Sequence, residues 1–325
     1  MRHDFTYKSL TDTSLIHGWI YIPTTATEEV GRKFPTVIMA PGLGAQKDMG
    51  LDRYASKFAK EGYAVLIIDY RSFGGSQAIA GTIEHRNNIN PWFHIDDIRS
   101  LVRQIQLNRF DNRIDKDNLV LWGTSYSGGH VIKLAHDLQK KKRIAGIKGV
   151  IAQVPHLDGR KASTAAIVHR GMIGTLRIAI LCFFDTVLSF MLDNSPFYVK
   201  IVGLKNETAY MILTPDEMKQ YYEKHPKKYL GHWENVAPAR AFKYMSFYNP
   251  IDVAHEVSVP ILFIGATDDQ LCPIGVIRDT AAKCPHAQVK EIDGGHHDVF
   301  NPAKVEVMSG WMIDFLKQVS PVTSA

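Results

Sequence analysis

The chain has 325 residues, of which 45% are hydrophobic and 22% charged, and its formal net charge is +5. These values exclude an intrinsically disordered chain, which would be poorer in hydrophobic residues and richer in net charge. The length exceeds that of a typical single domain, so we expect one core with an inserted segment. The densest basic run, at 140–143, ends a helical pattern, where cations favour the negative end of the helix dipole. We therefore expect no nucleic-acid partner.

The cysteines and the apolar segments bear on where the protein resides. Cys182, Cys272 and Cys284 are too few and too scattered for a disulfide framework, which favours a reducing compartment. The first twenty residues lack the apolar stretch of a signal peptide, so we expect a cytoplasmic protein. The apolar segment 178–192 is short for a membrane span and is interrupted by Asp185. We expect no stable membrane insertion.

Short β-branched runs alternate with segments of helical spacing along most of the chain. The runs predict strands at 36–40, 64–69, 118–123, 147–154, 259–265 and 287–292. After the first strand, apolar residues recur from Leu51 to Ala59 at the spacing of one buried helix face, and Gly62 suits the end of that helix. Such an order predicts an α/β fold with a mostly parallel, doubly wound sheet.

This alternation stops between residues 155 and 251. The segment has helical spacing and several aromatic residues but no convincing strand. We therefore predict a core formed by 1–154 and 252–325, with 155–251 inserted as a helical lid. Because the insertion leaves after one strand and returns before the next, it should lie over the carboxyl edge of the sheet, where open α/β folds bind ligands.

The stretch VLWGTSYSGG, at 120–129, places a serine on a tight corner between a predicted strand and a predicted helix. This is the context of a nucleophile elbow, in which the serine hydroxyl projects clear of the sheet. Gly123 relieves crowding two residues before Ser125, whereas Ser127 replaces the second glycine of the G-x-S-x-G motif. We predict Ser125 as the nucleophile.

A serine nucleophile needs a base, which we expect after the last strand. The segment EIDGGHHDVFNP, at 291–302, supplies His296 and His297. We prefer His296, because the histidine directly after the glycine pair lies at the mouth of the turn. Asp298 with the two histidines could suggest a metal site, but neighbouring side chains of one loop rarely chelate together. We expect neither a metal nor another cofactor.

The group that holds the base in the right tautomer is expected after the penultimate strand. Asp268 and Asp269 follow that strand. Counting forward three residues from Gly265 gives Asp268, whereas counting back four from Pro273 gives Asp269. We prefer Asp268, because the distance from the strand end fixes where the carboxylate emerges, and keep Asp269 as the alternative acid.

An oxyanion hole needs two preorganised donors near the nucleophile. The backbone N–H of Tyr126 directly follows the serine and is the first candidate. The second is the backbone N–H of Leu43, which follows Pro41 and Gly42 in the glycine-rich turn after the first predicted strand.

At these residues the chain resembles the α/β-hydrolases with serine-esterase and X-Pro-peptidase-like cores, a group that includes bacterial lidded hydrolases and fungal polyketide transferases and thiohydrolases. The matching stretches lie at 40–76, 121–131, 152–159, 214–218 and 294–300. Relatives often have His-Gly where this chain has Pro41-Gly42, a change that leaves the backbone donor intact. The resemblance implies acyl chemistry on esters or thioesters, with Ser125, His296 and one of the two aspartates.

We therefore expect a serine hydrolase that cleaves a small-molecule ester or thioester through an acyl-enzyme, with water or another acceptor releasing the acyl group. A serine peptidase of the X-Pro type is one alternative. A non-catalytic small-molecule binder on the same fold is another, although such a protein would normally lose one of the reactive groups.

An apolar stripe in the insertion suggests the kind of acyl group. We expect it to form the underside of the lid and to line the space above Ser125, with Arg177 and Asp185 facing away, so that the pocket holds a medium-length or polycyclic apolar group. The stripe comprises Ile173, Leu176, Ile180, Phe183, Phe184, Val187, Leu188 and Met191.

Overall fold

The computed structural model describes residues 2–23, 31–76, 86–192, 196–223 and 233–322. Its centre is an eight-stranded sheet in the order β1-β2-β4-β3-β5-β6-β10-β11. The strands are β1 (Arg2–Lys8), β2 (Leu15–Tyr21), β3 (Phe34–Ala40), β4 (Ala64–Ile68), β5 (Ile114–Thr124), β6 (Ile147–Gln153), β10 (Ile261–Ala266) and β11 (Ala287–Ile292). Every strand predicted for the core is present, with ends shifted by a few residues.

The sheet is parallel from β4 to β11, and antiparallel only at the edge formed by β1 and β2. Sequence patterning did not predict this hairpin. The reason is visible in β1, RHDFTYK, in which only Tyr7 is fully buried. A polar, exposed edge strand has little hydrophobic signal.

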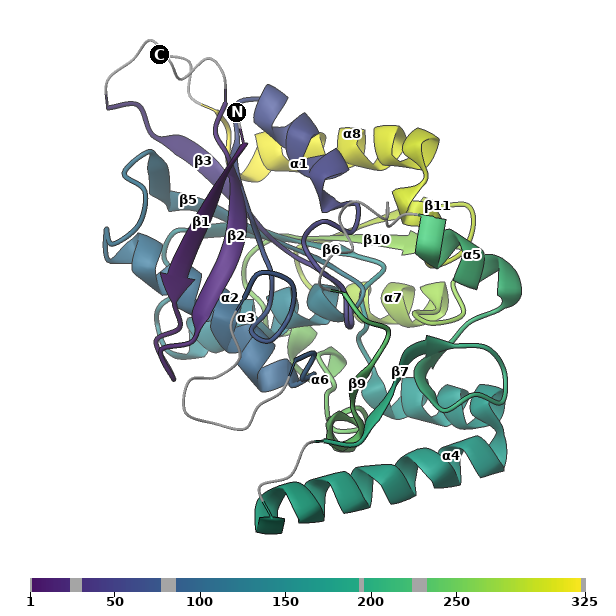
Figure 1. Ribbon diagram of the computed structural model, residues 1–325. Helices are drawn as coiled ribbons and strands as arrows, with labels where there is room; N and C mark the ends of the chain where they lie inside the picture. Colours follow the sequence, from purple (N-terminus) through teal and green to yellow (C-terminus); the bar gives the residue numbers. More distant parts are fainter. Residues whose placement is uncertain (1, 24–30, 77–85, 193–195, 224–232, 323–325) are drawn as a thin grey trace.

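Helices cover both faces of the sheet (Figure 1). In β5, Leu119 and Leu121 belong to one core cluster and Val120 and Trp122 to the other. This alternation shows a strand that is buried on both faces, as in a doubly wound fold. One face carries α1 (Leu51–Lys60) and α8 (Pro302–Val319); the other carries α2 (Pro91–Gln106), α3 (Tyr126–Lys140), α6 (Ile251–Ala254) and α7 (Ile274–Ala281).

The insertion between β6 and α6 is not wholly helical, which corrects the prediction. It contains a second, three-stranded sheet in the order β8-β7-β9. These strands are short and only partly apolar, so their period-2 pattern is weak in the sequence. The elements are α4 (Gly159–Leu192), β7 (Tyr198–Gly203), β8 (Ala209–Ile212), α5 (Pro215–Glu223), β9 (Ala237–Pro238) and the 3₁₀ helix η2 (Ala239–Tyr244).

Helix α4 consists of two parts that meet at Gly171, whose φ of 75° and ψ of 164° are not helical. The part after this kink runs along the lower edge of Figure 1, away from the central sheet. Among the described helices, α4 alone is long and apolar enough over Gly159–Leu188 to cross a membrane, a statement about length and composition only.

Candidate active site

Ser125 lies at the corner between β5 and α3 with φ 57° and ψ −119°, an unfavourable conformation for a residue with a side chain. Such a conformation costs about 1–3 kcal/mol and needs support from its surroundings. The N–H of Ser125 donates to the carbonyl of Gln153 at 2.8 Å, and the N–H of His156 donates to the carbonyl of Ser125 at 2.8 Å. A Cβ on Gly123 would lie 2.1 Å from the Ser127 carbonyl oxygen, so the corner requires glycine there.

Ser127 explains the departure from the G-x-S-x-G pattern. Its side chain is fully buried, and its Oγ donates to the carbonyl of Ala40 at 2.7 Å. The same oxygen accepts the N–H of Thr124 at 2.7 Å. The hydroxyl therefore ties the corner to the end of β3, a connection that glycine could not make.

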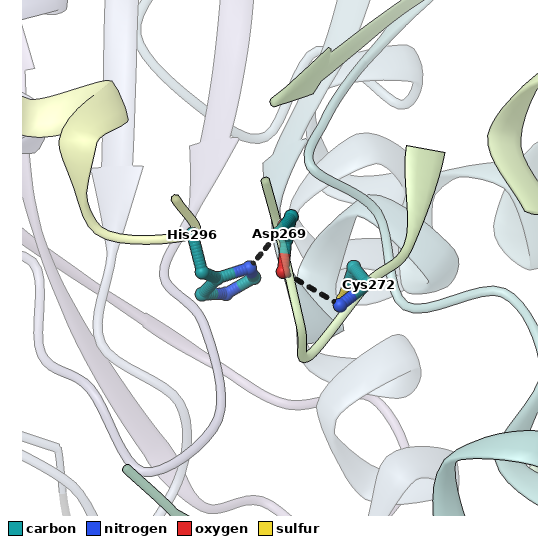
Figure 2. Close-up of side chains that lie close together, drawn as sticks. All are labelled: Asp269, Cys272 and His296. Atoms are coloured by element: carbon teal, nitrogen blue, oxygen red, sulfur yellow. Dashed lines mark hydrogen bonds and ion pairs between the residues drawn. The ribbon is translucent and has the colours of Figure 1, made fainter. Parts of the chain in front are cut away.

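His296 joins Ser125 to a buried carboxylate. Its Nδ1 lies 2.7 Å from Oδ2 of Asp269, and its Nε2 lies 2.9 Å from Oγ of Ser125. Because a carboxylate can only accept, Nδ1 carries the proton and Nε2 is free to accept from the serine. Oδ1 of Asp269 accepts the N–H groups of Leu271 and Cys272, both at 2.8 Å, which fixes the carboxylate. Figure 2 shows Asp269 between His296 and Cys272.

The structure corrects the preference for Asp268. Strand β10 continues through Ala266, one residue beyond the Gly265 from which the count was made, so the third residue after the strand is Asp269. The side chain of Asp269 is buried, whereas that of Asp268 is exposed. The backbone N–H of Asp268 donates to the carbonyl of Gly294 at 2.9 Å, which places this residue in the loop pairing and not beside His296.

The neighbouring histidine has a different setting. His297 is buried, and its ring lies edge-on against Tyr221 with centroids 5.3 Å apart. Asp298, the third member of the possible metal cluster, accepts the N–H of Gly295 at 2.8 Å. Of the two histidines, His296 is the one whose ring nitrogens lie against both a serine and a carboxylate.

The loop after β3 approaches the serine closely. A Cβ on Gly42 would lie 3.3 Å from Cβ of Ser125, tighter than most side-chain contacts. Leu43 and Tyr126 both line the cavity that contains Ser125. Leu43 belongs to the loop after β3 and Tyr126 is the first residue of α3. The role of their backbone N–H groups as an oxyanion hole remains a prediction.

The cavity beside Ser125 has an empty volume, including its mouth, of about 810 Å³, and most of its wall comes from the insertion. The first part of α4 supplies small residues, among them Ala162, Ala165 and Ala166. The apolar stripe after Gly171 does not line the cavity, so the prediction that it forms the underside of the lid is wrong. Helical spacing defines a stripe but does not determine which way the stripe faces.

A second, smaller cavity of about 410 Å³ also borders Ser125. Its wall includes Leu43, Tyr221, His296 and His297 as well as Ser125. The hydroxyl therefore lies where two cavities meet.

Sequence reasoning missed His156, which lines the larger cavity. Burial lowers its pKa to about 4, with Asp158 acting against this effect and His296 adding to it. Its Nε2 is buried and has no hydrogen-bond partner among the described residues. At neutral pH the ring is uncharged and offers one polar atom. The only signal in the sequence was its position just after β6, at the carboxyl edge where α/β folds bind ligands.

Cys272 is the second residue that the sequence analysis did not assign to the site. Burial, together with the nearby Asp269 charge, raises the pKa of its thiol well above the usual range, so the group is a neutral thiol. Asp269, Cys272 and His296 could offer a metal ion three atoms within 4.8 Å of one another (Figure 2). However, both oxygens of Asp269 already accept hydrogen bonds from this loop and from His296, so the cluster is better described as a hydrogen-bonded pair with a neighbouring thiol.

A mostly parallel, doubly wound sheet with a strained serine at a strand-to-helix corner defines an α/β hydrolase. The model of the alpha/beta hydrolase fold family matches residues 35–303, and the chain belongs to this family.

The chain is similar to the following two relatives in sequence and to one solved structure in fold. It is 30% identical over 305 residues to the quorum-quenching protein AidA of Acinetobacter baumannii, covering 94% of this chain and 91% of the relative. It is 25% identical over 276 residues to polyketide transferase ATR5 of Stachybotrys chlorohalonatus, covering 83% and 80%. The crystal structure of the α/β hydrolase GrgF from Penicillium sp. sh18 superposes with a TM-score of 0.77 at 21% identity, covering 99% and 100% of the two chains.

Proposed function

We propose that the protein is a serine hydrolase that cleaves a carboxylic ester or a thioester through an acyl-enzyme. The observation that carries the proposal is the chain of contacts from Ser125 through His296 to Asp269, at 2.9 and 2.7 Å, with the hydroxyl opening into a cavity. A serine hydroxyl becomes nucleophilic when a correctly oriented imidazole takes its proton.

In the proposed mechanism, Oγ of Ser125 attacks the substrate carbonyl carbon while Nε2 of His296 takes the hydroxyl proton. The backbone N–H groups of Leu43 and Tyr126 stabilise the oxyanion. His296 then gives its proton to the leaving oxygen or sulfur as that bond breaks, which leaves the acyl group on Ser125. Water, or another hydroxyl acceptor, releases the acyl group in a second step of the same kind, with Asp269 holding the imidazole throughout.

The cavity wall supports an apolar acyl group. Besides the alanines of α4, it contains Leu43, Tyr210, Met211, Phe242 and Met245. Both cavities border Ser125, which would allow the acyl part and the leaving group to occupy different cavities. Relatives bearing the names thiohydrolase and polyketide transferase also favour thioesters among the candidate substrates.

A peptidase is not favoured. A peptidase that holds the peptide amine by an anionic side chain needs an Asp or Glu near the serine, and the described wall of the larger cavity contains neither. Its charged member is Arg170, a cation that would repel an amine.

A fluorophosphonate probe tests the proposal directly. The wild-type protein should label at Ser125, Ser125→Ala should not label, and Ser258→Ala, which changes an exposed serine outside the cavity, should label like wild type. Turnover of p-nitrophenyl esters should fall by roughly four to six decades in Ser125→Ala, because members of such a unit fail together. Folded wild-type protein that does not label at Ser125 would overturn the proposal.

A further inference from the structure

The second part of α4 presents large apolar side chains to solvent. Met172 is 84% exposed, Ile173 70% and Met191 69%. The other members of this outward face are Leu176, Ile180, Phe183 and Phe184, each between 45% and 62% exposed. Soluble monomers normally expose single apolar residues or patches of a few hundred Å². This face therefore has the composition of a surface that is covered.

The opposite side of the same segment is already packed. Ile178 and Asp185 are fully buried, and the backbone N–H of Arg240, in η2, donates to Asp185 Oδ2 at 2.7 Å. The outward side carries little charge: Arg177, at its margin, is the one exposed charged residue between 172 and 188. A helix that is apolar on all sides is normally buried on all sides.

The spacing of the outward residues indicates what covers them. Ile173, Leu176, Ile180 and Phe183 follow one another at intervals of three, four and three residues, and the half-buried Val187 continues the series after four more. This is the a/d spacing of helices that pack along their length against another helix. A lipid surface requires an apolar face but not this register, and it favours a basic polar face that this segment lacks.

We propose that the outward face of α4, from Met172 to Met191, is the contact between two copies of this chain. Seven large apolar side chains, each at least 45% exposed, lie on this face, and a stable interface takes roughly 800 Å² from each partner. Met and Phe are enriched in the centres of such interfaces, and charged residues are depleted there. No other helix of the described chain presents a comparable face.

A second copy fits this face through two-fold symmetry. In a two-fold dimer the same patch contacts itself, so two α4 helices would run antiparallel with the middle of the seam on the axis. Residues near the middle, such as Ile180, would then face their own symmetry mates. Residues at opposite ends, Ile173 and Val187, would face each other.

Light scattering after size-exclusion chromatography tests the proposal on the full chain at fixed concentrations. Wild-type protein should have the mass of a dimer at tens of micromolar, and Leu176→Lys/Phe183→Lys should have the mass of a monomer. Val307→Lys, which makes the same chemical change at an exposed residue of α8, should remain a dimer. Circular dichroism and thermal unfolding establish that each variant is folded.

Disulfide cross-linking tests whether the two α4 helices meet at Ile180. In a Cys182→Ser background, Ile180→Cys should form a disulfide between copies on mild oxidation, whereas Val307→Cys should not. A wild-type monomer overturns the proposal, and binding of that monomer to anionic vesicles would identify a membrane surface as the occupant. A dimer that survives Leu176→Lys/Phe183→Lys also overturns it, because the contact must then lie elsewhere.

Discussion

Replacing the two adjacent aspartates one at a time gives the sharpest test of the proposed mechanism. Asp269 is buried, with its Oδ2 2.7 Å from Nδ1 of His296 and its Oδ1 held by two backbone N–H groups. Asparagine at this position would keep the shape of the side chain and could keep the backbone contacts. Its amide NH₂ would then face Nδ1, which favours the tautomer with the proton on Nε2.

That tautomer cannot accept the proton of Ser125. We therefore expect Asp269→Asn to lower kcat by about 10⁴, the loss seen when the wrong imidazole tautomer is favoured in a Ser-His-Asp unit. This corresponds to about 5.5 kcal/mol of transition-state stabilisation. Asp268→Asn is the matched control, since its side chain is exposed, and its kcat should stay within about threefold of wild type.

The assay is steady-state hydrolysis of a p-nitrophenyl ester together with the rate of fluorophosphonate labelling, which does not depend on the choice of substrate. Thermal unfolding of both variants separates lost chemistry from lost structure. If Asp268→Asn were the more damaging change, or if Asp269→Asn kept its kcat within tenfold, the role assigned to the 2.7 Å contact would be wrong.

Three further predictions concern the cavity, the buried imidazoles and the corner. In a series of p-nitrophenyl esters or thioesters with acyl chains of increasing length, kcat/KM should rise about fourfold per added methylene until the cavity is filled, because burying one methylene contributes about 0.8 kcal/mol. A flat series, or one that falls from acetyl onward, would exclude an apolar acyl pocket. Burial lowers the pKa of His94 to about 3 from its ordinary 6.5, so below pH 6.5 the unfolded chain binds a proton that the native chain does not. The free energy of unfolding, measured in urea, should therefore fall by about 2 kcal/mol between pH 7 and pH 5 on account of His94. His94→Phe should remove this part of the pH dependence, whereas His255→Gln, at an exposed site, should leave it unchanged. Ser127→Gly, which restores the usual motif, should lower the free energy of unfolding by about 1–3 kcal/mol through loss of the Ala40 and Thr124 contacts, and an unchanged value in urea would contradict this.

The features that could be predicted from the sequence depend on neighbours along the chain. The buried strands of the core have near-continuous apolar runs, and the corner at Ser125 needs glycine and small residues at fixed positions. The second member of the site, His296, could be chosen because the glycine pair before it fixes the turn. Each of these signals lies within a few residues of the feature that it predicts.

The choice between Asp268 and Asp269 could not be made correctly from neighbouring residues alone. The two aspartates differ by one position, and the choice depends on whether β10 ends at Gly265 or Ala266. That end is set by pairing with β11, in which Ala266 lies opposite Ile292, and this pairing joins segments distant in sequence. A strand end cannot be fixed to one residue without knowledge of its partner.

The outward face of α4 shows the same difficulty at the scale of a helix. Periodicity indicated an apolar stripe after Gly171, but a helix with apolar residues on two sides has no single inward direction. The kink at Gly171 determines which way the second part of α4 faces. Its φ of 75° and ψ of 164° are accessible to glycine and strained for other residues, so the two parts of α4 can present different sides to the core. Before Gly171 the helix walls the cavity, and after it the helix carries the proposed contact between copies. Because one continuous element carries both, a partner bound to the second part would restrain the position of the first, and the width of the acyl cavity would depend on the dimer.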